Sequence, residues 1–411
     1  MSASTDTGGA GGSALARCIA CATDHFAREH WGQTPLLTRA AELGGDFTDL
    51  LSAAAVDELV SDRGLRTPFL RMAKEGSVLP AERFTRGGGA GASVTDQIAD
   101  DKVLTAVADG ATLVLQALHR SWPPLVAFGS RLAGELGHPV QINAYVTPPQ
   151  NQGFAPHYDV HDVFVLQVAG RKQWTIHEPV VDAPLDNQPW EQFRGEVAAR
   201  AAEEPLIDTV LEPGDALYLP RGTIHAAKAH RDTSIHLTIG VHPVSRSQLV
   251  GHLLDLAQDD PQLRTSLPMG VDLSDPTVLA AELAATVEAL HSRLDAIAAA
   301  DVARRVGTHL MQRTRPEPIG PLAQLAAAEA LRPEGVLRMR AQLRARVETG
   351  ADRLDLVLLD RTITLPATAA DAIKRVLGGG PFTPAELPGL DAGEQLTVCR
   401  RLLREGVLVS V

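Results

Sequence analysis

Cysteine, aromatic residues and long apolar runs are all scarce in this sequence of 411 residues. Its three cysteines form an odd, sparse set, which argues against a disulfide scaffold and fits a reducing compartment. No apolar run reaches the roughly 18 residues that a membrane-spanning helix needs. The N-terminus, MSASTDTGGAGGSALA, lacks the basic start and apolar centre of a secretory signal. We therefore predict a cytoplasmic protein with no membrane partner.

Two short motifs are also incomplete. Cys18 and Cys21 form a C-x-x-C, but no second pair follows at zinc-ribbon spacing and no strand precedes it as in a thioredoxin motif. We interpret both as ordinary cysteines on a helix face. The glycine-rich stretch 84–95, FTRGGGAGASVT, lacks the Gly-Lys-Ser/Thr ending of a phosphate-binding loop. We expect a mobile surface loop there.

Positively charged residues are also fewer than negatively charged ones. The formal net charge of -12 argues against general adhesion to nucleic acid or to an anionic membrane. With 45% hydrophobic residues the chain can bury a sizeable core, and its length suggests two or three domains.

The pattern of apolar residues changes along the chain. Residues 14–75 have helical spacing with little strand character, and short strands are expected at 141–146, 163–168, 173–177, 216–219 and 235–241. Many short strands at such spacing are typical of a jelly-roll sandwich or barrel. We predict an α+β chain with a flexible tail (1–15), a barrel domain with N-terminal helices (16–247), a helical segment (248–320) and a small C-terminal domain (321–411).

The last two parts leave alternatives open. The Ala- and Leu-rich helix expected at 275–313 fits packing on a second copy, as in a homodimer, as well as packing on its own barrel. Residues 331–411 combine strands, helices capped at Thr383 and Asp391, and a final strand, which resembles a winged helix. Arg338, Arg340, Arg344 and Arg346 would share one strand face. A net charge of only +2 over this part favours a solvated face over strong nucleic-acid binding.

Ionisable residues gather just before the expected strand 163–168. His157 and Asp159 are two residues apart, so on an extended chain their side chains point to the same side and can reach one ion. Burying such groups costs several kcal/mol unless something pairs with them. A third ligand must come from another segment.

The segment PGDALYLPRGTIH, residues 213–225, supplies that ligand in His225. Its spacing, G-x5-P-x-G-x2-H, matches the second motif of the cupin superfamily, and with H-x-D upstream it resembles the JmjC-type oxygenases. Two imidazoles and one carboxylate leave open positions on an octahedral ion, as non-haem Fe(II) oxygenases require. The alternative is a barrel that has lost its metal and keeps these groups as core residues. His161 is interpreted as a residue near the mouth of the site or behind a ligand.

The stretch 143–174, NAYVTPPQNQGFAPHYDVHDVFVLQVAGRKQW, is similar to the ribosomal oxygenase branch of JmjC proteins. The resemblance implies a double-stranded β-helix fold and a helical dimerisation segment. It also implies that Lys172 binds the distal carboxylate of 2-oxoglutarate, that Asn143 lines the cosubstrate pocket and that Tyr145 lies near the substrate. Ordinary barrel packing remains the alternative for Asn143 and Tyr145. Arg171 should face solvent.

Two further residues nearby, Trp174 and His236, are expected to belong to the core, with His236 a hydrogen-bonded core histidine rather than a ligand. The predicted function is an oxygenase that uses Fe(II), 2-oxoglutarate and O2 to hydroxylate a protein side chain, with a ribosomal protein as the implied substrate. The alternatives are a tailoring hydroxylase for small molecules or peptides and a metal-free cupin that acts as a dimeric regulator.

Overall fold

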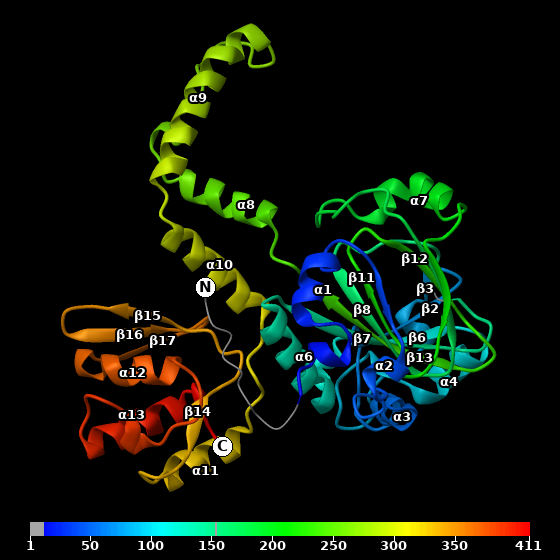
Figure 1. Cartoon of the computed structure of the whole chain (residues 1–411), viewed down its shortest axis with the longest axis horizontal. Helices are drawn as coiled ribbons and strands as arrows, with labels where there is room; N and C mark the ends of the chain where they lie inside the picture. The colour runs from blue at the N-terminus through cyan, green and yellow to red at the C-terminus, as the bar shows by residue number, and fades with distance from the viewer. Residues whose placement is uncertain (1–11, 153) are drawn as a thin grey trace. The chain divides into compact units, whose positions relative to one another are not determined.

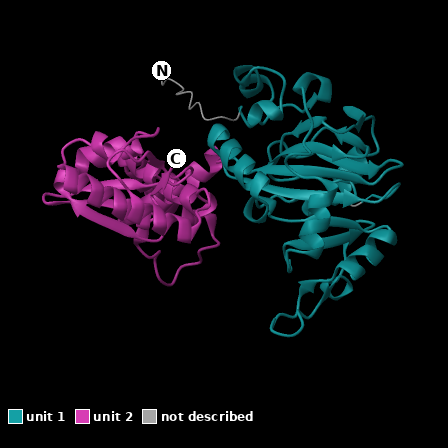
Figure 2. Cartoon of the chain, turned by 90° about the horizontal axis from the view of Figure 1, so that it is seen from below, with its two compact units in different colours: residues 1–243 teal, residues 244–411 magenta. Residues whose placement is uncertain are grey.

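The computed structural model describes residues 12–152 and 154–411, and the chain divides into two compact units, residues 1–243 and 244–411 (Figure 2). Residues 1–11 of the predicted tail lie outside the described part. Ala14 and Leu15, at the end of that predicted tail, are buried in the core of the first unit.

Two antiparallel sheets form the barrel of the first unit (Figure 1). The larger has the strand order β1-β11-β8-β13-β7-β6-β2-β3, and the smaller has the order β10-β9-β12. The strands span Leu36–Thr38 (β1), Leu70–Lys74 (β2), Ser77–Val78 (β3), Thr112–Leu115 (β6), Val140–Thr147 (β7), Asp162–Ala169 (β8), Lys172–His177 (β9), Ile207–Leu211 (β10), Ala216–Leu219 (β11), Ile224–Ala229 (β12) and Ser234–Val241 (β13), and β4 (Thr85–Arg86) pairs with β5 (Gln97–Ile98) alone.

Alternation along the strands divides the apolar residues between two cores. Phe164 and Leu166 of β8 face an outer core shared with the N-terminal helices, whereas Val163 and Val165 face an inner core with Trp174 of the smaller sheet. Because successive strand residues point to opposite faces, one strand can serve both cores. Polar residues that share the inner face therefore project into the barrel.

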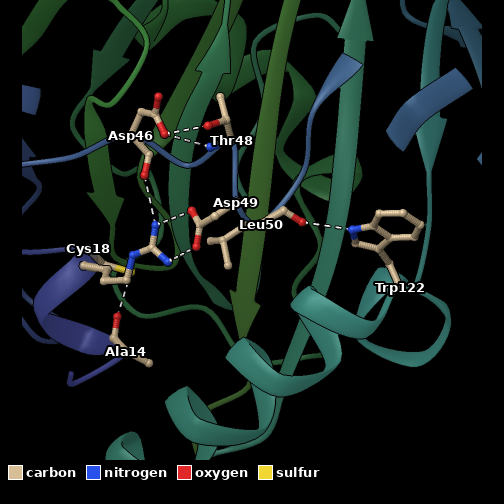
Figure 3. A network of polar contacts seen from close by, with 8 residues as sticks. Ala14, Cys18, Asp46, Thr48, Asp49, Leu50 and Trp122 are labelled. Carbon is tan, nitrogen blue, oxygen red and sulfur yellow. Dashed lines mark hydrogen bonds and ion pairs between the residues drawn. The ribbon is translucent and has the colours of Figure 1, made fainter. Parts of the chain in front are cut away.

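Helices cover the outer face of the larger sheet. They span Thr23–Glu29 (α1), Ala40–Leu43 (α2), Ala53–Ser61 (α3), Asp100–Ala108 (α4), Leu118–Ser121 (α5) and Pro123–Leu136 (α6), while α7 (Arg194–Arg200) belongs to the connection between β9 and β10. Polar contacts tie the N-terminal part down: the Arg17 guanidinium donates to both carboxylate oxygens of Asp49 at 2.7 Å, and the Trp122 indole N–H donates to the Leu50 carbonyl at 3.0 Å (Figure 3).

The five predicted strands of the barrel are confirmed to within two residues at each end. The expectation of little strand character in 14–75 was wrong, because β1 and β2 join the larger sheet there. The cysteines were also misplaced: Cys18 follows a short 3-10 turn and Cys21 lies before α1, so neither is on a helix face. Both thiols are free.

Helices open the second unit. They span Arg246–Ala257 (α8), Pro276–Ala296 (α9), Ala299–Arg313 (α10) and Pro321–Ala330 (α11), so the predicted helix at 275–313 is broken at Ile297 and Ala298. In α9 only Ala289 is buried among its 21 residues. No helix in the described part of the chain is long and apolar enough to cross a membrane.

The rest of the second unit has two small sheets: β14 (Leu337–Met339) pairs with β18 (Leu408–Ser410), and β15 (Arg346–Thr349), β16 (Arg353–Val357) and β17 (Thr362–Pro366) form a meander. They pack with α12 (Ala370–Leu377) and α13 (Ala392–Arg404). Capping boxes form at both predicted positions, but the one at Thr383 opens only a 3-10 turn, Pro384–Glu386.

The predicted basic strand face is not present. The segment that was expected to be one strand is split into β14 and β15 by a turn, with Gln342 in the left-handed region at φ 58°. Arg338 forms a bidentate ion pair with the Glu317 carboxylate, with both hydrogen bonds at 2.7 Å, and Arg340 donates to the Glu317 carbonyl. These guanidinium groups hold the chain together and are not a solvated row.

Candidate active site

The segment before β8 is joined to β12 by backbone hydrogen bonds. The His157 N–H donates to the His225 carbonyl at 3.2 Å, and the His225 N–H donates to the His157 carbonyl at 2.8 Å. The Gly222 N–H donates to the Asp159 carbonyl at 2.9 Å. This pairing brings together two motifs that lie far apart in the sequence.

Gly222 makes the approach possible. Its φ is 88°, and a Cβ at this position would lie 2.6 Å from the Val181 carbonyl oxygen. Only glycine adopts this turn without strain and without a clash. The glycine of the cupin-like motif therefore turns the chain so that β12 begins beside the His157 segment.

His157, Asp159 and His225 each offer a donor atom, and these atoms all lie within 4.8 Å of one another. The His225 Nε2 is 3.7 Å from an Asp159 carboxylate oxygen, and the two imidazole centroids are 4.5 Å apart. Within the described residues this is the one cluster of at least three such groups with metal-ligand spacing. The structure thus brings the three predicted ligands together.

Hydrogen bonds on the far side of each ring fit a metal. The Nδ1 of His157 lies 2.8 Å from the Ala155 carbonyl, and the Nδ1 of His225 lies 3.0 Å from the Thr223 carbonyl. A carbonyl only accepts, so each Nδ1 carries the proton and each Nε2 has a free lone pair. Main-chain carbonyls that orient ligand histidines in this way are usual in metal sites. The donor set fits Fe(II).

Electrostatics keeps this set ready for a cation. Burial lowers the pKa of His225 to about 4, with His157 as a further cause, so this ring is neutral near pH 7. Burial raises the pKa of Asp159, but the imidazoles of His161, His225, His157 and His242 more than offset it, and the pKa lies below the usual range. The cluster therefore presents a negative charge at Asp159 and a neutral nitrogen donor at His225.

Two neighbours of the cluster have other roles. Asp162 is 1% exposed and accepts hydrogen bonds from the Tyr218 hydroxyl at 2.9 Å and the Arg221 N–H at 3.0 Å, so it fixes the turn before His225. The His161 ring stacks on His242, with centroids 4.8 Å apart, and lines the cavity beside the cluster. His161 thus lies near the cluster without joining its donor set, as predicted.

Lys172 projects inward from β9 because the Gly170 turn sets its register. Gly170 has a φ of 61°, and a Cβ there would lie 2.2 Å from the Thr233 carbonyl oxygen. Lys172 is 4% exposed, and its Nζ donates to the Thr147 hydroxyl at 3.1 Å. Among the described residues no carboxylate forms an ion pair with it. Arg171, one residue earlier, faces outward and forms an exposed ion pair with Asp232.

Burial lowers the pKa of Lys172 to about 7, so the amine is only partly protonated near neutral pH. A buried cation without a counter-ion is costly, and an anion that enters the cavity would relieve that cost. The amine lines the same cavity as His157, Asp159 and His225. This arrangement suits a ligand with a negative end at Lys172 and a chelating end at the cluster.

Asn143 and Tyr145 also line this cavity, from the inner face of β7. The Asn143 side-chain oxygen accepts from the Ala117 N–H at 3.0 Å, which supports a left-handed backbone at Ala117 with φ 55°. The Tyr145 ring stacks on His236 with centroids 5.1 Å apart and an interplanar angle of 7°. Asn143 and Tyr145 therefore each have a structural role as well as a place in the cavity wall.

Residues 130–249 match the family model of the JmjC domain. This segment is a JmjC domain. It contains β7 to β13, and with them His157, Asp159, Lys172 and His225.

Curated relatives resemble the JmjC domain and its surroundings. The chain is 27% identical over 276 residues to the bifunctional lysine-specific demethylase and histidyl-hydroxylase NO66 of Drosophila persimilis, covering 60% of this chain and 35% of the relative. It is 31% identical over 256 residues to ribosomal oxygenase 1 of Gallus gallus, covering 60% and 40%. The chain thus spans little more than a third of the length of these relatives.

A solved structure extends the likeness in fold. The ribosomal oxygenase YcfD of Escherichia coli, in complex with cobalt and 2-oxoglutarate, matches with a TM-score of 0.52 and 18% identity, over 94% of this chain and 97% of the other. At this identity the match shows the fold alone. The JmjC fold, with its mixture of helices and sheets, is thereby confirmed.

Sequence reasoning missed several groups around the JmjC cavity, which has a volume of about 850 Å³. Arg71 of β2 and Trp190 of the β9–β10 connection line it, although neither belongs to a recognised motif. Trp190 comes close because the buried residues Tyr158, Val197 and Ile224 pack the connection against both ligand segments. A lone tryptophan in a 29-residue connection gives no sequence signal of this.

One prediction for the core needs correction. Trp174 and His236 are buried, at 4% and 2% exposure, as expected. However, His236 is not a fully hydrogen-bonded histidine, because among the described residues neither its Nδ1 nor the Trp174 Nε1 has a hydrogen-bond partner. The two rings meet edge to face at 5.4 Å and border the cavity.

Proposed function

We propose that this protein is an Fe(II)- and 2-oxoglutarate-dependent oxygenase that hydroxylates a side chain of a protein. His157, Asp159 and His225 would hold the iron, and Lys172 would bind the distal carboxylate of 2-oxoglutarate. The observation that carries the proposal is one cavity that contains both a two-histidine, one-carboxylate donor set with free Nε2 atoms and a buried amine that has no counter-ion among the described residues.

Iron, when bound with 2-oxoglutarate and O2, supplies the oxidative chemistry, in which the cosubstrate becomes succinate and CO2 and one oxygen atom enters a substrate C–H bond. The chain's own residues do the rest. Ala155 and Thr223 keep the protons of the ligand histidines at Nδ1. Val163, Val165 and Trp174 form an apolar part of the cavity wall that Lys172 also lines, and an ion pair in apolar surroundings is stronger than in water.

A ribosomal protein is the favoured substrate. The relatives named ribosomal oxygenase 1 and NO66, and the shared fold of the ribosomal oxygenase YcfD, support this choice. The cavity also has room for a side chain next to a bound 2-oxoglutarate. The same room would admit a small molecule, so a tailoring hydroxylase is the second candidate.

The other parts of the chain suit accessory roles. We propose that the segment α8 to α10 forms a homodimer contact, since α8 and α9 carry the exposed apolar residues Leu249, Val250, Leu254, Leu283 and Val287. We also propose that residues 321–411 form a winged-helix-like domain that does not bind nucleic acid strongly, because most of its arginines are engaged within the chain.

The experiment that tests the proposed function measures succinate formed from 2-oxoglutarate by Fe(II)-loaded protein under air, with His225→Ala as the control. We expect slow succinate formation without substrate, and none in the variant. Succinate formation would justify a mass-spectrometric search for products that have gained one oxygen atom. A wild-type protein that neither retains iron nor forms succinate would overturn the oxygenase and favour the metal-free regulator.

A further inference from the structure

Arg71 lies in the same row of the larger sheet as two residues of the cavity wall. In the strand register Arg71 of β2 faces Val114 of β6, Val114 faces Tyr145 of β7, and Tyr145 faces His236 of β13. Residues paired in this way point to one face of a sheet. The Arg71 side chain is thus directed to the inner face, and it lines the cavity.

The Arg71 guanidinium is held in place by two aromatic rings. Its Cζ lies 5.6 Å from the Phe154 ring centroid, within the range of a cation–π contact. It also lies beside the Tyr145 phenol: burial raises the pKa of Tyr145, whereas the neighbouring charge of Arg71 opposes that rise. Phe154 and Tyr145 meet edge to face at 6.1 Å. The charged group is therefore positioned and partly dehydrated.

No carboxylate among the described residues forms an ion pair with Arg71, and its buried Nε has no hydrogen-bond partner. Aromatic faces compensate a guanidinium only weakly compared with a carboxylate. Arg71 is thus a second cation, besides Lys172, that the cavity leaves without a counter-ion.

Arg71 and the metal cluster line the same cavity, and the Phe154 ring beside Arg71 lies 6.0 Å, between centroids, from the His157 ring. The Asp159 carboxylate raises the pKa of Tyr145, and Arg71 lowers it, so both charges are close to the phenol. A substrate that places a C–H bond at the cluster and continues past Tyr145 would reach Arg71. Lys172 cannot serve this end of the substrate, because under the proposed function it holds 2-oxoglutarate.

We propose that Arg71 is a specificity-determining residue that binds a carboxylate of the substrate. A guanidinium presents a planar fork of N–H donors that matches the two oxygens of a carboxylate. The substrate would be a peptide segment with Asp or Glu a few residues from the hydroxylated side chain, or one that ends in a free α-carboxylate nearby. This inference rests on the proposed function and names the substrate class of the same site.

The first test compares pools of short synthetic peptides with blocked ends. One pool has random neutral and basic residues, a second has one Asp or Glu added on either side of the centre, and a third has a free C-terminus. Hydroxylation by the Fe(II)- and 2-oxoglutarate-loaded protein is followed by mass spectrometry. We expect wild type to prefer the second or third pool over the first by about tenfold, and the preferred pool identifies the source of the carboxylate.

The overall negative charge of the protein makes a preference for the acidic peptide pools easier to interpret. A chain of net charge -12 should repel acidic peptides in general, so a preference for them requires a local cation. Arg71→Met should remove the preference, and Arg71→Lys, which keeps the charge but loses the fork, should retain part of it. Equal hydroxylation of all pools by wild type, or an unchanged preference in Arg71→Met, would overturn the assignment.

Arg375→Met is a matched control. Arg375 of the second unit also lies over an aromatic ring, with its Cζ 5.2 Å from the Phe382 centroid, but it is outside the cavity. This variant should keep the wild-type preference. It separates loss of a cation–π contact as such from loss of the proposed carboxylate site.

A second measurement does not depend on turnover. The Arg71 side-chain N–H resonance, identified by its absence in Arg71→Met, is followed in protein saturated with the diamagnetic ion Zn(II) and with 2-oxoglutarate. N-acetylglycine should shift this resonance, and the neutral N-acetylglycinamide should not. A resonance that neither compound moves would overturn the carboxylate site. Absence of succinate formation with a normal shift would instead sink the proposed function and leave the anion site standing.

Discussion

Two basic residues of the first unit differ from most arginines of the second unit in how they are paired. In the first unit, Lys172 and Arg71 enter the cavity without a carboxylate partner among the described residues. In the second unit, the arginines are mostly engaged: Arg338, Arg346, Arg353 and Arg361 pair with carboxylates, and Arg332, Arg340, Arg375, Arg400 and Arg401 donate to main-chain carbonyls. A cation without a carboxylate partner can gain free energy by binding an anionic ligand, whereas a paired cation contributes to the stability of the fold.

The largest effect should come from the donor set itself. His157→Ala removes one of three donors and leaves its neighbours facing a vacant position, so iron affinity should fall by at least about 100-fold. Iron content after gel filtration measures it. His177→Ala is the control, because His177 is a buried histidine of β9 outside the cavity. A His157→Ala protein that retains stoichiometric iron would contradict the assignment of His157.

Lys172→Met should weaken 2-oxoglutarate binding and stabilise the unliganded protein. Loss of the Lys172 ammonium should weaken 2-oxoglutarate binding by about 100-fold, measured by calorimetry on Mn(II)-loaded protein. The unliganded protein should become more stable, by on the order of 2 kcal/mol, because an unpaired buried amine is replaced by an apolar chain of similar length. Lys228→Met, at an exposed position of β12, should change neither quantity. Lower stability together with normal binding would refute the role of Lys172.

The binding of 2-oxoglutarate should depend on pH through the titration of Lys172. Its pKa is about 7 in the folded protein, and a bound carboxylate should raise it, so 2-oxoglutarate binding at pH 8 should take up close to one proton. Calorimetry in buffers of different ionisation heat measures that proton. The unfolded chain keeps the lysine proton up to a pKa of about 10.4, so it binds more protons than the folded protein between pH 7 and that value. The stability contribution of Lys172 therefore rises over this window. Proton release on binding would contradict the prediction.

The metal cluster could be predicted from the sequence because its geometry is local. H-x-D places two donors on one side of an extended segment, and the turn with Gly222 delivers the third at a fixed spacing. Lys172 follows from the turn at Gly170 in the same way. Strands such as β7 and β8 have apolar patterns strong enough to be recognised.

The remaining parts depend on tertiary packing. The strand β12, IHAAKA, has alanines and a lysine in place of β-branched residues and gives little strand signal. Arg71 reaches the cavity only because β2 pairs with β6 at the far side of the sheet, a pairing that no local pattern indicates. Similarly, alternating arginines at 338–346 suggested one solvated face, but Glu317, distant in sequence, captures two of them and a turn divides the strand.

The smallest predicted effect concerns those captured arginines. Arg338 and Glu317 form a two-fold contact, but Arg338 keeps 36% of its side-chain exposure, so solvent weakens the ion pair. Arg338→Met should therefore lower the free energy of unfolding by only about 1 kcal/mol, measured by urea unfolding, while iron binding and 2-oxoglutarate binding stay at wild-type values. Arg404→Met, at an exposed position at the end of α13, should leave stability unchanged. If Arg338→Met instead left stability intact and abolished binding to an anionic polymer, the guanidinium would be a ligand-facing group, and the contrast between the two units would fail.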